Sequence, residues 1–187
     1  MKKTAPFIIF LLVALPSFAQ KIKYTDAFVQ KLEQVQLDLY TPTEGKYKSK
    51  RPPKNDYQAI DHLIFSKKEQ LEIRYTIIPF SILDKRTQIP NIDFMRVVSS
   101  VATNDDREDA IISLHNLEEA DLREHFNADW GSIAYFQPKA KFSSWKYCRM
   151  LGLYAEGRGM VYVFFLYDEP SVHLDNRLQA LRFNVKL

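Results

Sequence analysis

The chain has 187 residues, which suits one domain with a hydrophobic core of its own. Its 26 basic and 23 acidic residues nearly balance, which argues against nucleic acid or an anionic membrane as the main partner, because both need a concentrated basic surface. The single cysteine, Cys148, excludes an internal disulfide, so buried apolar surface must supply the stability. We expect Cys148 to be buried and unreactive, because it lies in an apolar run.

The first nineteen residues have the three-part pattern of an export signal. Two lysines form a positive head, an apolar run follows from Pro6 to Leu15, and Ser17 and Ala19 place small residues where a signal peptidase reads. The apolar run of about ten residues is half of what a membrane-spanning helix needs. We therefore predict cleavage after Ala19 and release of residues 20–187 as a single soluble domain, periplasmic or extracellular. That mature chain loses two basic residues and no acidic ones, so it is close to neutral.

The next part of the chain predicts a helix, a short strand and a loop. The helix covers 25–36 with Thr25 as its N-cap, and the strand covers 37–40. The segment Thr43–Asn55 is predicted as a loop or irregular edge, because it contains a glycine and two consecutive prolines. We interpret its lysine-rich stretch as solvent-exposed and not as an anion site; the residues are Lys46, Lys48, Lys50, Arg51 and Lys54.

A β-hairpin is predicted next, with strands at Tyr57–Phe65 and Leu71–Ile78 joined by a polar turn. The second strand alternates apolar residues, predicted to face the core, with polar residues, predicted to face solvent: Leu71, Ile73, Tyr75 and Ile77 against Glu72, Arg74 and Thr76. This alternation is typical of an antiparallel sheet with one solvated face, whereas parallel strands tend to be apolar throughout.

The middle of the chain, from Asp93 to Phe126, is predicted to be helical in two or three pieces after a loop over 81–92. The first piece carries an apolar stripe with the spacing i, i+3, i+4, i+7, formed by Phe94, Val97, Val98 and Val101. Asn116 followed by Glu119 has the spacing of a capping box, which predicts that the last piece begins there. Its buried side would hold Leu117, Ala120 and Phe126.

The last third predicts strands at Ser132–Phe136, Trp145–Tyr154 and Met160–Tyr167, with a turn containing two glycines between the last two. The strand Met160–Tyr167 is almost continuously apolar, so we place it in the centre of the sheet. A short helix over 175–180 and a final strand over 181–187 follow. Hairpins join most of these strands, which predicts an α+β fold with an antiparallel sheet packed against helices.

This order of elements resembles the PsbP-like fold, named for an extrinsic photosystem II subunit and shared with a nuclear import factor. The resemblance rests on topology: the strand Leu39–Pro42 that ends in proline, the Tyr57–Ile78 hairpin, the helical middle, and the Trp145–Tyr167 hairpin before a short helix and a last strand. No motif of that family matches residue for residue, so no functional residue is carried over. The resemblance implies a non-catalytic accessory or binding domain.

Metal and cofactor sites are not predicted. His115, Glu118 and His125 would fall on one side of an ideal helix, but the helical rise puts the two histidines about 15 Å apart, while an ion needs ligands within about 2 Å of itself. We expect His125 to pair instead with Asp121, one turn earlier. The glycine-rich stretch Glu156–Gly159 joins two strands and opens no helix, so it is not a phosphate cradle.

Five residues remain as candidates for binding or catalysis, all near predicted strand ends or turns. Asp129, Asp168 and Glu169 offer carboxylates, although some acidic pair is found in any chain with 23 acidic residues. We interpret Trp130 as a core residue that covers the sheet, because tryptophan usually buries a large area. We interpret Arg158, at a predicted hairpin tip, as a solvated turn residue.

Three functional hypotheses follow. The first is a non-catalytic accessory or interaction domain of the cell envelope or exterior, which binds another envelope or secreted protein. The second is a hydrolase of envelope or extracellular material that uses Asp129, Asp168 and Glu169. The third is a carrier with an aromatic pocket for a small ligand. A polar cleft that holds acids with raised pKa values would favour the hydrolase, and an exposed apolar patch would favour the interaction domain.

Overall fold

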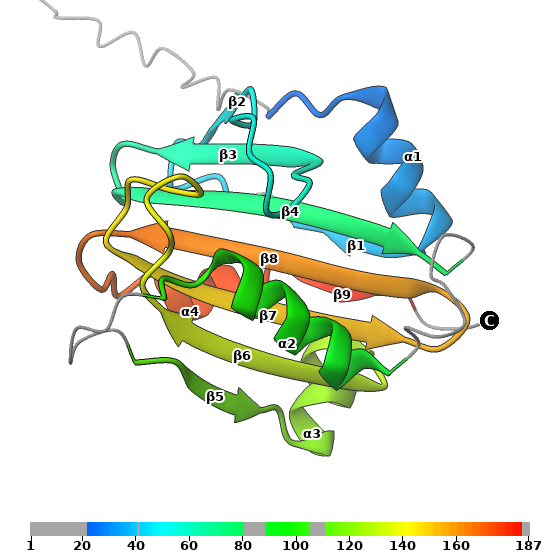
Figure 1. Cartoon of the computed structure of the whole chain (residues 1–187). Coiled ribbons are helices and arrows are strands. Elements are labelled where there is room, and N and C mark those ends of the chain that lie inside the picture. The colour runs from blue at the N-terminus through cyan, green and yellow to red at the C-terminus, as the bar shows by residue number, and fades with distance from the viewer. Residues whose placement is uncertain (1–21, 41, 81–88, 105–110, 185–187) are drawn as a thin grey trace, which may run out of the picture.

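The computed structural model describes residues 22–40, 42–80, 89–104 and 111–184. It contains a seven-stranded antiparallel sheet in the order β2-β3-β4-β8-β7-β6-β5 and a two-stranded sheet of β1 and β9 (Figure 1). The predicted α+β class with an antiparallel sheet is therefore confirmed. The predicted signal sequence and its cleavage point, most of the predicted loop over 81–92, and the last three residues of the predicted final strand lie outside the described residues.

The described elements follow one another along the chain with these bounds: α1 Asp26–Gln34, β1 Leu37–Leu39, β2 Lys48–Lys50, β3 His62–Ser66, β4 Leu71–Pro79, α2 Pro90–Val101, β5 Ser113–Asn116, α3 Glu119–Asp121, the π-helical turn η2 Leu122–Phe126, β6 Trp130–Phe136, β7 Tyr147–Ala155, β8 Gly159–Tyr167, α4 Leu174–Leu178 and β9 Leu181–Phe183.

Strand β8 is the centre of the large sheet, as its apolar sequence predicts. All nine of its residues are buried, and it pairs along its length with β4 on one side and β7 on the other. A strand covered on both faces needs apolar side chains on both faces, which explains the nearly continuous apolar run. Cys148, in the neighbouring strand β7, is also buried as predicted, and burial raises the pKa of its thiol.

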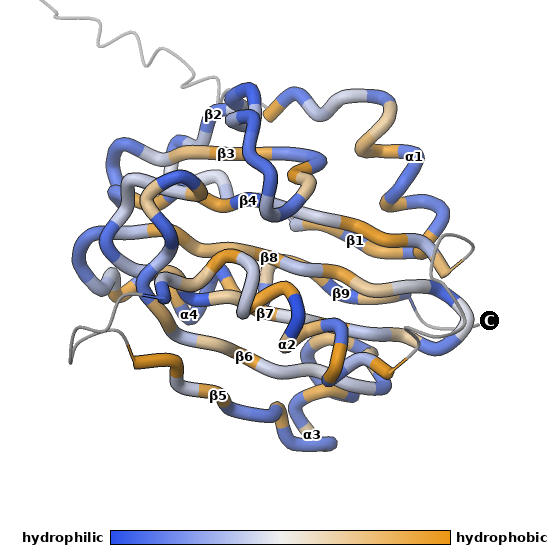
Figure 2. Tube along the Cα trace, viewed as in Figure 1, coloured by the Kyte–Doolittle hydropathy of each residue, from blue (hydrophilic) through white to orange (hydrophobic). Residues whose placement is uncertain are grey.

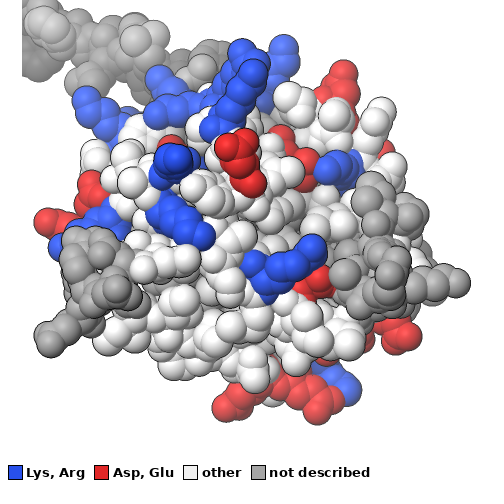
Figure 3. Space-filling model, viewed as in Figure 1, with Lys and Arg blue, Asp and Glu red and all other residues white. Residues whose placement is uncertain are grey.

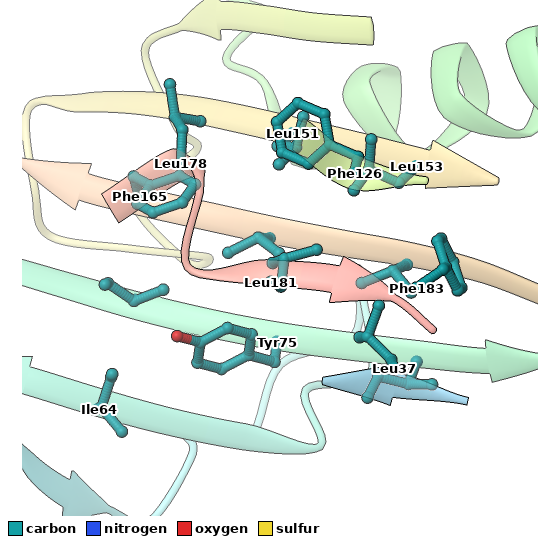
Figure 4. Close-up of a cluster of buried hydrophobic side chains, with 14 of the residues drawn as sticks. Leu37, Ile64, Tyr75, Phe126, Leu151, Leu153, Phe165, Leu178, Leu181 and Phe183 are labelled. Carbon is teal, nitrogen blue, oxygen red and sulfur yellow. The ribbon is translucent and has the colours of Figure 1, made fainter. Parts of the chain in front are cut away.

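Helices and the small sheet cover both faces of the large sheet. On one face, α1, α4, η2 and the β1–β9 pair build a core with side chains of β3, β4, β7 and β8. Figure 4 shows side chains of this core converging from many elements, among them Phe126, Leu151, Phe165, Leu181 and Phe183. On the other face, α2 packs its predicted stripe of phenylalanine and valine residues, all buried, against β6, β7 and β8.

Helix α1 forms where its sequence predicts it. The backbone N–H of Phe28 donates to the Thr25 side chain at 3.3 Å, which confirms the predicted N-cap. Phe28 is buried, and Lys31 Nζ donates to Asp61 Oδ1 at 2.7 Å, which ties the helix to the segment before β3. The short strand β1 follows as predicted and pairs with β9, so segments from near the two ends of the chain lie side by side.

The predicted solvated face of β4 is wrong. Arg74 and Thr76 are buried, although Leu71, Ile73, Tyr75 and Ile77 do face the core as predicted. Arg74 Nη1 donates to the carbonyl of Phe142 at 2.7 Å, and Thr76 Oγ1 donates to the carbonyl of Ala59 at 2.5 Å. The second face is therefore covered as well, and its polar side chains are paired with backbone carbonyls instead of water.

The helical prediction for the middle of the chain is only partly correct. Helix α2 begins at Pro90, earlier than predicted, and a proline in the first turn suits a helix start. Residues Ser113–Asn116 are a strand, β5, and not a helix. Asn116 therefore caps nothing: the N-cap of α3 is Glu118, without a side-chain hydrogen bond. Pairing with β6 satisfies the backbone groups on the inner side of β5 and overrides the capping-box spacing.

The lysine-rich stretch is exposed as predicted, but three of its residues form a strand. Lys48, Ser49 and Lys50 make up β2, which pairs with β3 at one edge of the sheet. The hairpin that follows begins later than predicted, at His62. Just before β2, the chain is held by a buried network in which Tyr47 Oη donates to Glu69 Oε2 at 2.6 Å.

A buried ion pair completes this network. Arg177 of α4 donates to Glu69 through Nε at 3.1 Å and through Nη2 at 2.6 Å. Burial raises the pKa of Glu69, but the hydrogen bonds from Arg177 and Tyr47 outweigh it and hold that pKa below its ordinary value. The carboxylate thus connects the turn after β3, the segment before β2 and α4, three parts of the chain that are far apart in sequence.

Candidate interaction surface

The outer edge of β5 presents backbone groups to solvent. In the part of the chain that the structure describes, β5 pairs only with β6. Leu117 N–H donates to the Gly131 carbonyl at 3.0 Å just after the strand. Hydrogen-bonded and non-hydrogen-bonded pairs alternate along an antiparallel ladder, so Ser113 and His115 also direct their backbone groups toward β6. The N–H and C=O groups of Leu114 and Asn116 therefore point outward, away from the sheet.

Apolar side chains accompany this open edge on the α2 side. Leu114 lies opposite Ala134, which belongs to the core under α2, so Leu114 faces the same side as that helix. Its side chain is nevertheless 43% exposed, and Ile112 is exposed beside it. On α2, Ile92 and Met95 lie outside the buried stripe and are exposed too. We call Ile92, Met95, Ile112, Leu114 and the half-buried Trp130 the β5–α2 surface.

Two contacts hold α2 against the sheet beside β5. Gly152 of β7 lies directly under Phe94: a Cβ on this residue would be 2.4 Å from Phe94 Cδ2, so only glycine admits the helix this closely. Trp130 of β6 packs edge-on against Phe94, with ring centroids 5.6 Å apart. Trp130 thus covers the sheet as predicted, as a half-buried residue of β6 that packs under α2.

Charge is distributed unevenly around this surface. Figure 3 shows mostly uncharged side chains over the strands below α2, a basic side chain with an acidic one beside it at α2 itself, and acidic side chains gathered at α3. Glu118, Glu119, Asp121 and Glu124 are all exposed at this end, directly after β5 in the chain. One of them, Glu119, pairs with Arg123, and both side chains are exposed. The β5–α2 surface therefore combines exposed apolar side chains with the exposed Arg96 of α2, and it is acidic where β5 leads into α3.

The opposite face of β5 is polar and aromatic. His115 Nε2 lies 3.1 Å from Ser113 Oγ, and the His115 ring packs edge-on against Tyr135. Arg149 of β7 stacks over the same Tyr135 ring at 4.7 Å and binds Asp175 of α4. Arg149 Nε is buried and lacks a hydrogen-bond partner among the described residues. Strand β5 therefore separates two chemically different surfaces.

The candidate carboxylates lie apart. Asp129 is exposed at one end of the β7–β8 hairpin, where its Oδ2 accepts from the Glu156 backbone N–H at 2.7 Å. Asp168 is exposed at the other end, where its Oδ1 accepts from the Lys146 backbone N–H at 3.0 Å, and Glu169 follows it. The nine residues of β8 separate the two ends by roughly 26 Å at the usual rise of a strand. The structure does not bring Asp129 together with Asp168 or Glu169.

The prediction of a solvated Arg158 is wrong, because this residue is buried. Its Nη1 donates to the Asn184 carbonyl at 2.5 Å, and its own carbonyl accepts from Phe80 N–H at 2.7 Å. The hairpin tip folds back onto the residue that follows β9, so Arg158 has a structural role. Its binding partners come from distant parts of the chain and leave no local signal in the sequence.

The predicted histidine contact is present, although the helix assumed for the metal test is not. His115 lies on β5 and His125 in η2, so they share no helix face. His125 Nε2 lies 4.0 Å from Asp121 Oδ1, the expected local partner. Within the described ranges, no group of three or more His, Cys, Asp or Glu residues is arranged to hold a metal ion. No helix of the described residues is both long and apolar enough to cross a membrane.

None of the protein-family models, curated proteins or solved structures compared with this chain matches it. The resemblance to the PsbP-like fold therefore stays a prediction based on the order of elements. Sequence reasoning missed the β5–α2 surface. Its one sequence signal is that Ile92 and Met95 are apolar residues of α2 placed outside the stripe that the helix buries.

Proposed function

We propose that the protein is an exported, non-catalytic interaction domain of the cell envelope or exterior, and that it binds another protein through the β5–α2 surface. The observation that carries this proposal is the edge of β5, where outward backbone groups and exposed apolar side chains occur together. Exposed apolar side chains that adjoin one another on a protein surface are a mark of interaction sites. The half-buried Trp130 adds an aromatic residue of the kind that is enriched at such interfaces.

The hydrolase hypothesis receives less support from this arrangement. Asp129 lies at the opposite end of β8 from Asp168 and Glu169, whereas the two carboxylates of a glycosidase lie within about 10 Å of each other. The carrier hypothesis needs an aromatic pocket between sheet and helices, and the aromatic side chains Phe126, Phe165 and Phe183 are instead buried among the aliphatic side chains of the core, as Figure 4 shows. The interaction domain is the function that the described geometry supports best.

Capture of a partner followed by direct binding tests this function. The protein, expressed from the full sequence, is used as bait for envelope and secreted fractions, and any captured protein is purified and titrated against it by calorimetry. We expect Leu114→Lys to weaken this binding at least tenfold, because the substitution places a charge in the apolar surface. The intact mass of the bait also tests export, since cleavage after Ala19 leaves Gln20 as the first residue.

A matched control is available on the other half of the molecule. Val29 of α1 is 37% exposed, close to the 43% of Leu114, and α1 packs against β4 and β1 instead of β5. Val29→Lys adds the same charge at a similarly exposed apolar site, and we expect it to leave binding unchanged. Equal loss with both variants, or no loss with Leu114→Lys, would refute the β5–α2 surface as the binding site.

A further inference from the structure

We propose that the partner contributes an extended segment that adds to β5 as a further strand of the sheet. This inference rests on the proposed function and concerns the form of the bound partner. Leu114 and Asn116 direct N–H and C=O groups outward at every second residue, a spacing of about 6.7 Å. Only another strand offers backbone donors and acceptors at this spacing, because a helix has already paired its own backbone groups.

The side chains of the two surfaces define the chemistry of this segment. One face of the added strand would lie beside Leu114 and Ile112, so we expect apolar residues at alternate positions on the α2 side. The other face would lie beside Ser113 and His115, which can exchange hydrogen bonds with polar residues. Strand β5 itself contains no Lys, Arg, Asp or Glu, so the middle of the segment needs no charge.

The acidic end of β5 sets the charge of the segment and distinguishes a different protein from a second copy. An added strand that runs past Asn116 reaches the exposed carboxylate of Glu118, beside the Glu119–Arg123 pair, and this carboxylate favours a Lys or Arg in the partner at that end. A second copy paired by two-fold symmetry would run antiparallel and place its own Ile111 and Ile112 there. Apolar side chains do not complement carboxylates, so we infer that the segment belongs to another protein.

Peptide selection tests the composition of this segment. The immobilised protein is used to select random dodecapeptides displayed on phage, with counter-selection on the Leu114→Lys variant. We expect enriched peptides to alternate apolar and polar residues over four to six positions, with Lys or Arg at one end. Enrichment of the helical spacing i, i+3, i+4, or failure to enrich any sequence, would overturn strand addition.

Amide exchange on the complex tests the backbone contacts. In the free protein we expect the amides of Leu114 and Asn116 to exchange with solvent much faster than those of Ser113 and His115, which donate to β6. Binding of a selected peptide should slow the exchange of Leu114 and Asn116 at least tenfold. Unchanged exchange at these two amides, with the peptide bound, would overturn the proposal.

A proline variant distinguishes the contribution of the Leu114 backbone to binding from that of its side chain. Because the Leu114 N–H points away from β6, Leu114→Pro removes an outward donor without removing a bond of the β5–β6 ladder. We expect it to abolish peptide binding, and the exchange measurement on the unaltered protein serves as the test if this variant does not fold. Concentration-dependent dimers in which Leu114 and Asn116 are already protected would overturn the assignment to another protein. A third outcome is that the protein captures a partner, that Leu114→Lys abolishes this binding, and that the amides of Leu114 and Asn116 are not protected in the complex. That outcome would reject strand addition alone and leave the proposed function intact.

Discussion

The two edges of the seven-stranded sheet are built differently. Strand β2 ends the sheet with Lys48 and Lys50, both exposed, and Lys50 Nζ lies 3.7 Å from the centroid of the Phe65 ring. Strand β5 ends it on the other side with Leu114 exposed and with no Lys, Arg, Asp or Glu of its own. In Figure 2, β2 is blue, whereas the chain that enters β5 is orange. Lysines on an edge strand oppose the approach of another strand, so β2 is protected against strand addition and β5 is not.

The two edges also differ in how they are anchored. The segment before β2 is fixed by the buried network of Tyr47, Glu69 and Arg177. Strand β5 is attached by its ladder with β6 and by Ser132 Oγ, which donates to the His115 carbonyl at 3.0 Å. One edge is therefore both charged and fixed by a distant helix, whereas the other has no Lys, Arg, Asp or Glu and, among the described residues, is attached on one side. The comparison teaches that lysines protect only one of the two edges, and the unprotected edge is the one we propose for binding.

Breaking the anchor of β2 should have the largest effect. Glu69→Gln removes the buried ionic partner of Arg177 and leaves only the exposed Glu44, 3.6 Å away, so we expect it to lower the free energy of unfolding by about 3–5 kcal/mol. Urea unfolding measures this change. Glu119→Gln is the matched control, because Glu119 forms an exposed pair with Arg123 that should contribute less than about 1 kcal/mol. Equal effects of the two substitutions would show that the buried pair does not anchor the β2 side.

The same anchor should make stability depend on pH. The pKa of Glu69 is lower in the folded than in the unfolded protein, so the pair stabilises fully above the unfolded value, about 4.3, and loses its contribution as pH falls through the folded value. We expect the difference in unfolding free energy between the parent protein and Glu69→Gln to shrink as the pH falls below about 4.3 and through the folded pKa. A difference that stays constant across these pH values would contradict this assignment.

Removing the lysines of β2 should allow another strand to pair with this edge of the sheet. The double substitution Lys48→Val and Lys50→Val converts β2 into an uncharged strand, and we expect concentration-dependent self-association, measured by analytical ultracentrifugation. Lys54→Val removes an exposed lysine outside the strand and should leave the sedimentation of the protein unchanged. If the double variant sediments like the parent protein at every concentration, the lysines do not protect this edge.

Changes on α2 should have the smallest effect. Ile92→Ser and Met95→Ser alter exposed side chains, so we expect each to change the free energy of unfolding by less than about 0.5 kcal/mol. Each should weaken binding of the captured partner two- to tenfold in the calorimetric titration, a smaller loss than Leu114→Lys causes. Val29→Ser provides the control. Full affinity in both α2 variants would confine the interface to β5.

The sequence correctly predicts those helices and strands whose own pattern of apolar and capping residues determines which side chains are buried. The apolar run of β8, the stripe of α2 and the Thr25 cap of α1 each repeat a local rule that the structure keeps. Strand β5 could not be predicted in this way. It is four residues long and, among the described residues, is paired on one side only. The spacing of Asn116 and Glu119 favours a helix, and the pairing with β6 overrides that preference.

The candidate site depends even more on distant contacts. The local sequence does not predict which of these side chains is buried: the apolar Leu114 is exposed, and the polar Thr76 is buried. Both outcomes follow from which element lies over the strand, and that is fixed by residues elsewhere in the chain. The same holds for Arg158, whose partner Asn184 follows β9. Sequence reasoning therefore placed candidates at strand ends, whereas the apolar surface lies along an edge.

The pairing of β4 with β8 has a consequence for how the protein folds. Glu72 pairs with Leu166 and Pro79 with Gly159, so the two most extensively paired halves of the sheet meet only after most of the chain is available. Contacts between such distant segments slow folding, because a long loop must close before they form. The β1–β9 pair repeats this arrangement with segments even farther apart. During synthesis the large sheet therefore cannot be completed until the last quarter of the chain emerges, and the export proposed above would require the same delay.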